Sequence, residues 1–124
     1  MRRDNGQTLI EFAFVLPLLV LLVFGLLQFG VAFHNYLGIT DAARVAARAA
    51  AVKRTSNPCG AATAAIQSTV STTQWSQISS RITCAAGSNV GDPVTITIAY
   101  PYSIGLPGFS KSGDLTASAQ ERLE

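Results

Sequence analysis

The sequence predicts an α+β fold: a long N-terminal α-helix, then a short helix and a small antiparallel β-sheet of about three strands. Three features predict it. An uncharged apolar run extends from Phe12 to Phe33, and helical periodicity resumes at Pro58. Residues 94–100 alternate between apolar and smaller side chains, as a half-buried strand does. The 124 residues leave room for one small domain beyond the helix.

The apolar run has the length of a membrane span. It is interrupted only by Pro17, Gly25, Gln28 and Gly30, and no charged residue lies between Glu11 and Asp41. At ~1.5 Å per residue, Phe12 to Phe33 covers about 33 Å, close to the ~30 Å hydrocarbon core of a bilayer. We therefore expect a transmembrane helix over residues 7–33, which continues outside the membrane over residues 34–54. An ordinary soluble cytoplasmic enzyme is excluded.

Charge sets the expected orientation of the span. Arg2 and Arg3 precede it, whereas Asp41, Arg44 and Arg48 are the first charges beyond it. The positive-inside rule places the N-terminus in the cytoplasm and exports the domain over residues 55–124. We thus expect a single-pass inner (plasma) membrane protein.

A cleavable secretory signal is the main competing interpretation of the N-terminus. Gly30-Val31-Ala32 has the small residues of a cleavage site. The apolar stretch, however, exceeds the usual length of such a signal, and Glu11 and Pro17 lie in its early part. These features favour a retained span.

The first residues carry a more specific pattern. A short polar, basic leader, residues 1–6, ends in Gly6, and Glu11 follows after four residues. This spacing resembles the processing site of type IV pilin-like proteins. Residues 9–17, with the leucine-rich stretch that follows, resemble more narrowly the TadE-like pseudopilins of tight-adherence (Tad, Flp-type) pili, and the Ala/Arg-rich segment 41–50 is similar to the end of that family's helix.

The resemblance implies a function and partners. A prepilin peptidase would cut between Gly6 and Gln7, and the helix would then enter a pilus together with other pilin or pseudopilin subunits on an inner-membrane assembly platform. The protein is therefore expected to be located first in the membrane, in contact with lipid, and afterwards in the pilus or at the cell surface. Members of this family are generally regarded as minor subunits. Whether this subunit is major or minor is left open by the sequence, as is the ligand of the exported domain.

Glu11 and Pro17 each admit two interpretations. A carboxylate near hydrocarbon calls for a partner, which after cleavage would be the α-amine of Gln7 on a neighbouring subunit, setting the axial register of the helices. Alternatively, Glu11 reaches into water at the membrane edge and has no role. Pro17 removes one helical hydrogen bond and favours a kink, or it is simply a tolerated transmembrane proline.

The helix is expected to continue to about Arg54. Two rows of alanine, Ala42, Ala46, Ala50 and Ala43, Ala47, Ala51, lie along it. Such small side chains allow close contact with helices of neighbouring subunits. Alanine's helix propensity explains the rows equally well.

The exported segment has clear local signals. Asn57 and Pro58 predict the N-terminus of a short helix that ends near Ser71. Strands are expected at 78–84, 94–100 and 115–122, with turn residues at 87–93 and a loop built by Pro101, Gly105, Pro107 and Gly108. Residues 67–80, rich in Ser, Thr and Gln, have the composition of an exported surface. Cys59 and Cys84 both lie in the exported segment, where oxidation is possible, and we expect a disulfide worth about 3.5 kcal/mol; the alternative is two free cysteines.

No catalytic or metal site is predicted. His34 is the only histidine, the two cysteines lack zinc-ligand spacing, and no glycine-rich phosphate loop is present. A net charge of +2 is too small to indicate nucleic-acid binding. We therefore expect no enzyme, no cofactor and a structural subunit. The alternatives are an uncleaved membrane-anchored module whose exported domain binds a partner, and a small secreted protein or hydrolase.

Overall fold

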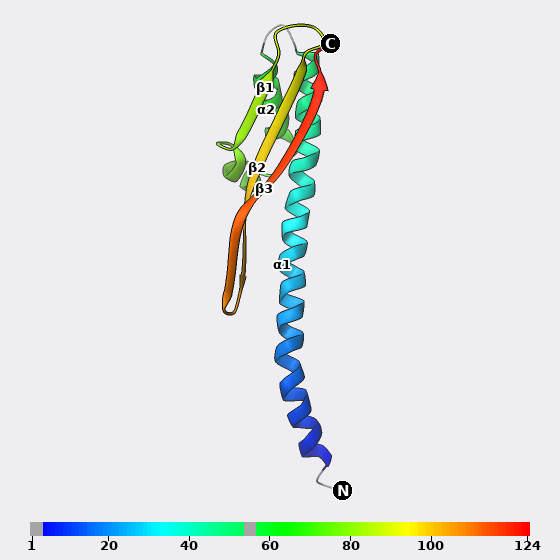
Figure 1. Cartoon of the computed structure of the whole chain (residues 1–124), viewed down its shortest axis with the longest axis vertical. Coiled ribbons are helices and arrows are strands. Elements are labelled where there is room, and N and C mark those ends of the chain that lie inside the picture. The colour runs from blue at the N-terminus through cyan, green and yellow to red at the C-terminus, as the bar shows by residue number, and fades with distance from the viewer. Residues whose placement is uncertain (1–3, 54–56) are drawn as a thin grey trace.

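The structure, a computed structural model, describes residues 4–53 and 57–124. Its main element is α1 (Asp4–Val52), a helix of 49 residues and therefore about 73 Å long. The sheet and the short helices gather around the C-terminal half of α1, and the N-terminal half extends away from them (Figure 1). The helix thus has one half inside a small domain and one half outside it.

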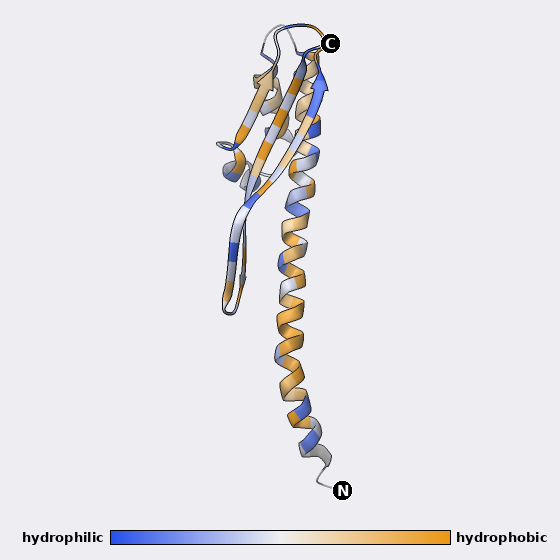
Figure 2. Ribbon diagram, viewed as in Figure 1, coloured by the Kyte–Doolittle hydropathy of each residue, from blue (hydrophilic) through white to orange (hydrophobic). Residues whose placement is uncertain are grey.

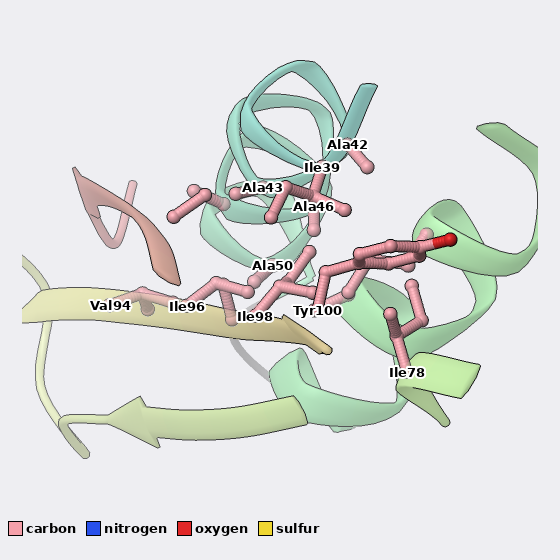
Figure 3. Packing of buried hydrophobic residues seen from close by; sticks show 14 of the residues in the cluster. Ile39, Ala42, Ala43, Ala46, Ala50, Ile78, Val94, Ile96, Ile98 and Tyr100 are labelled. Atoms are coloured by element: carbon pink, nitrogen blue, oxygen red, sulfur yellow. The ribbon is translucent and has the colours of Figure 1, made fainter. Parts of the chain in front are cut away.

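The C-terminal half of α1 packs through its alanines. Ile39 and five alanines are fully buried, and Ala51 is 6% exposed; the five are Ala42, Ala43, Ala46, Ala47 and Ala50. Side chains of this face point toward the sheet (Figure 3). The chain's own domain therefore covers both alanine rows, so neither row is available for the contact with neighbouring subunits that was one of the two interpretations. A small Cβ lets the helix axis approach the strands closely, so the spacing serves packing within the monomer.

Two short helices cover the same core from the side. In α2 (Pro58–Thr69), Asn57 caps the N-terminus by accepting a hydrogen bond from the Gly60 N–H at 2.9 Å, as the sequence predicts. The helix α3 (Thr72–Ile78) was not expected within the polar stretch at 67–80. Ser71 and Gln74 form a capping box at its start, and Ile78 is buried at its end. The local signal was the Ser-x-x-Gln spacing of that box.

The sheet has three antiparallel strands in the order β1-β2-β3, as predicted. They are β1 (Ile82–Ala86), β2 (Pro93–Leu106) and β3 (Phe109–Arg122). The alternation in β2 holds: Val94, Ile96 and Ile98 are fully buried and Tyr100 is 8% exposed. The first strand begins later than the expected 78–84, because Ile78 closes α3 instead.

The β2–β3 hairpin is longer than predicted. Residues 101–106, expected to form a loop, continue β2, and the turn is confined to Pro107 and Gly108, where Gly108 has φ 81°. Ala99 donates its N–H to Arg81 O on the β1 side. The nitrogen of Pro101, two residues later, faces the same side. β1 does not reach this position, because its first residue, Ile82, pairs with Ile98. A proline therefore breaks no ladder hydrogen bond there.

A disulfide joins α2 to the sheet. Cys59 and Cys84 are bonded, with 5.8 Å between their Cα atoms and a sequence separation of 25. The bond ties the first turn of α2 to the middle of β1. It thus closes the segment that contains both short helices.

Replacing both cysteines with alanine is expected to lower the unfolding free energy of the domain by about 3 kcal/mol, because the unfolded chain gains loop entropy. Urea unfolding in detergent, followed by fluorescence of Trp75 against the core, measures this. A reductant should lower the midpoint of the wild type to that of the double variant and leave the variant unchanged. Equal midpoints for oxidised wild type and variant would contradict the expectation.

Ala46→Leu is expected to destabilise the same domain by about 1–3 kcal/mol, because Ala46 is fully buried in the cluster between α1 and the sheet and a larger side chain must displace its neighbours. The matched control is Ala64→Leu, at an exposed alanine of α2. The same urea titration compares them. If Ala46→Leu unfolded at the control's midpoint, the alanine face would not be a tightly packed internal contact.

Candidate functional site

Most of the N-terminal half of α1 is exposed within the described chain. Its large apolar side chains are exposed, from Leu9 at 68% and Phe14 at 80% to Phe33 at 53%. In Figure 2 this part of the ribbon is mostly orange, the colour of hydrophobic residues, with a few paler or blue positions. The most apolar window of the helix has a mean hydropathy of 2.7 and is 0% buried. This is the one helix in the described part long and apolar enough to cross a membrane, and it is compatible with a membrane anchor.

Gly6 and Gln7 lie near the N-terminal end of the described part of α1. A Cβ built on Gly6 would meet nothing within 4 Å. A larger side chain at Gly6 would therefore disturb no contact of the fold.

Glu11 lies one turn further along the exposed helix. Its carboxylate accepts a hydrogen bond from the Gln7 side-chain amide at 3.5 Å, a weak contact. Within residues 4–53 and 57–124 the ion pair is Arg81–Asp114, so no described cation neutralises Glu11. Arg2 and Arg3 lie outside the described residues. The carboxylate is thus positioned beside the start of the helix and accessible to a cation from outside the fold.

Pro17 lies inside α1, which remains helical on both sides of it. Its ring nitrogen donates nothing to the carbonyl of Ala13, four residues earlier. The N-terminal turns of α1 curve gently away from the rest of its axis in Figure 1. A bend, without a break in the helix, is what the structure shows in this region.

The charged residues that follow the apolar segment are exposed. Arg44 and Arg48 share one face of α1, and with Glu121 of β3 they line a shallow groove. Neither arginine forms an ion pair with a described residue. They leave a basic stripe on the outside of the domain.

Gln28 is the residue that the sequence analysis missed. It lies in the apolar part of α1, and its side-chain amide donates to Gly105 O at 2.7 Å, while its Oε1 accepts from the Gly105 N–H at 3.1 Å. A backbone group 77 positions away is thereby held against the helix. The available signal was that Gln28 is the single polar side chain between Glu11 and His34.

The described residues offer no catalytic arrangement. His34 lies exposed on α1, and together with Asp41 and Arg44 it lines a shallow groove. Among these residues no group of three or more His, Cys, Asp or Glu side chains is placed to hold a metal ion. Trp75 packs against the core.

Comparison with known protein families identifies the apolar helix. Residues 6–48 match the family model described as TadE-like protein. The match begins at Gly6, includes Glu11 and Pro17, and ends at Arg48 within the alanine-rich packing face. No curated protein and no solved structure shows significant similarity to the chain. The N-terminal helix is therefore similar to that of TadE-like proteins, which is the resemblance that the pattern of its first residues predicts.

Proposed function

We propose that the protein is a minor pilin-like subunit of a Tad (Flp-type) pilus, processed after Gly6 and assembled through α1. The observation that carries the proposal is the TadE-like helix over residues 6–48, whose first half is apolar and uncovered. The role is structural: the subunit occupies a place in a filament and performs no chemistry.

The exposed half of α1 supports a function in which the surroundings of the helix change. Burying one large apolar side chain contributes about 1.5–3 kcal/mol, and this half exposes many of them. Water is therefore not its resting environment. Lipid covers it after insertion, and other pilin-like helices replace the lipid in the filament.

The first turn supports processing by a prepilin peptidase. Gly6 and Gln7 lie near the N-terminal end of the described helix and are exposed, and a Cβ at Gly6 would meet nothing within 4 Å, so the domain does not cover this segment. A glycine before the cleaved bond presents no Cβ to a protease at the membrane surface. Cleavage removes residues 1–6 and leaves the α-amine of Gln7 as a new cation at the start of the helix.

The second candidate is an uncleaved, membrane-anchored module whose exported domain binds a partner. One observation favours it: the domain completes its core with its own half of α1, and so needs no other subunit to fold. An intact Met1 in protein recovered from membranes, independent of any prepilin peptidase, would distinguish this module from a processed subunit.

Gly6→Leu is expected to leave the unprocessed precursor in the membrane, because the added side chain obstructs the peptidase and not the fold. Gly25→Leu is the matched control, since a Cβ at Gly25 also meets nothing within 4 Å. Mass analysis of the N-terminus, with and without the peptidase, measures processing. Normal removal of residues 1–6 from Gly6→Leu would contradict the proposed cleavage.

Glu11→Val is expected to be cleaved normally but to enter filaments about tenfold less, a difference of ~1.4 kcal/mol per contact. The physical reason is loss of the carboxylate that pairs with the Gln7 amine of a neighbouring subunit. Glu11→Gln, which keeps the shape without the charge, should behave like the valine variant, and Glu11→Asp should retain part of the incorporation. Quantifying the subunit in sheared pili tests this; normal incorporation of Glu11→Gln would remove the charge pair from the account.

A further inference from the structure

The β2–β3 hairpin extends beyond the body of the sheet and runs along α1 toward its N-terminus (Figure 1). We call residues 101–113 the distal hairpin; they lie past Ile98, the last β2 residue paired with β1. Gln28 holds Gly105 of this segment by two hydrogen bonds. The distal hairpin is therefore fixed beside the apolar half of α1, at the height of Gln28.

The side chains of the distal hairpin suit an interface between water and lipid. Around its turn lie Ile104, Leu106, Pro107 and Phe109, of which Phe109 is 57% exposed. Lys111 is the single charged residue of the segment, and it is exposed. The apolar side chains around the turn suit the boundary between headgroups and acyl chains. Lys111, with no acidic residue in the segment, suits the negatively charged phosphates of the headgroups.

The backbone of the distal hairpin sets a limit on its depth. β1 has no residue opposite positions 99–106, and β3 is an edge strand. Gln28 satisfies both backbone groups of Gly105, but the other edge groups of the segment have no strand partner. Open sheet edges are not tolerated in hydrocarbon and are tolerated where water and headgroups bind them. The segment can therefore rest on the bilayer but not enter its centre.

The helix gives the same boundary independently. From Glu11 to Gln28, α1 rises about 26 Å, near the ~30 Å thickness of a hydrocarbon core. Every residue between these two is apolar, glycine or proline. Two polar side chains thus mark the two faces of a bilayer, and the distal hairpin lies at the one on the exported side.

We propose that the distal hairpin is a second membrane contact, resting on the phospholipid headgroups of the exported leaflet, and that its hydrogen bonds to Gln28 fix the insertion depth of α1. The hydrocarbon segment then ends near Leu27, earlier than the expected Phe33. This inference rests on the membrane anchoring in the proposed function, and it adds a lipid-binding surface outside the helix.

Depth-dependent quenching of tryptophan by brominated phospholipids tests the proposal. The full chain is reconstituted in vesicles of zwitterionic and anionic phospholipid, with Trp75→Phe as background because Trp75 is the only tryptophan. Phe109→Trp should emit at a shorter wavelength than the water-exposed control Val90→Trp. It should also lose most of its fluorescence to bromines near the glycerol end of the acyl chains. Val90 lies in the turn between β1 and β2, and its side chain is 69% exposed. Val90→Trp should therefore not be quenched.

A third position separates this proposal from the anchoring itself. Val20→Trp, in the apolar half of α1, should be quenched by bromines at the middle of the acyl chains. Quenching of Val20→Trp without quenching of Phe109→Trp would overturn the hairpin contact and leave the anchor intact. If neither were quenched, the anchoring of the proposed function would fail as well.

The role of Gln28 is tested in the same vesicles. Gln28→Leu should lower the shallow quenching of Phe109→Trp, because the hairpin is released from the helix. Gln67→Leu, at an exposed glutamine of α2, should leave it unchanged. The quenching of Phe109→Trp should also persist when the protein is diluted in lipid. Its loss on dilution would show that a second copy of the chain covers the hairpin, and an unchanged signal in Gln28→Leu would overturn the depth-setting role.

Discussion

The packing of the alanine face of α1 on the buried face of β2 is the contact on which the rest of the structure depends. Ala46 and its neighbours share one buried cluster with Val94, Ile96 and Ile98, and protein interiors of this kind are closely packed. The small domain can cover only as much helix as its strands span. Because α1 spans about 73 Å and β2 about 46 Å, the sheet leaves the N-terminal end of the helix uncovered.

The two halves of α1 therefore have different roles: one half belongs to the folded domain, and the exposed half is the part proposed to contact lipid and other subunits. The half that carries Ala46 is satisfied by the monomer, so the exported domain can fold before any assembly. The large apolar side chains of the other half, Phe14 among them, are exposed in the described chain. A subunit that is first held in a membrane and later joins other subunits needs a stably folded domain and an apolar helix that the domain leaves exposed.

Local rules explain what the sequence predicted and what it did not. The apolar span, the Asn57 cap and the β2 alternation are properties of contiguous residues, and they appear in the structure. The alanine rows favour any close partner, so their spacing alone does not say that the partner is the chain's own sheet. The strand through Pro101 depends on where β1 ends, and the Gln28–Gly105 contact joins residues 77 positions apart. Neither relation is visible in a local pattern. The residues of the processing segment were found from their spacing, and their roles remain to be measured.

The central claim is that the exposed half of α1 exchanges lipid for protein. A photo-crosslinking amino acid in place of Phe14, the most exposed large side chain of that half, tests it most directly in the producing cell. The account predicts lipid adducts when the assembly machinery is inactive and adducts to other pilin-like subunits when it is active. Lipid adducts alone under both conditions would contradict it.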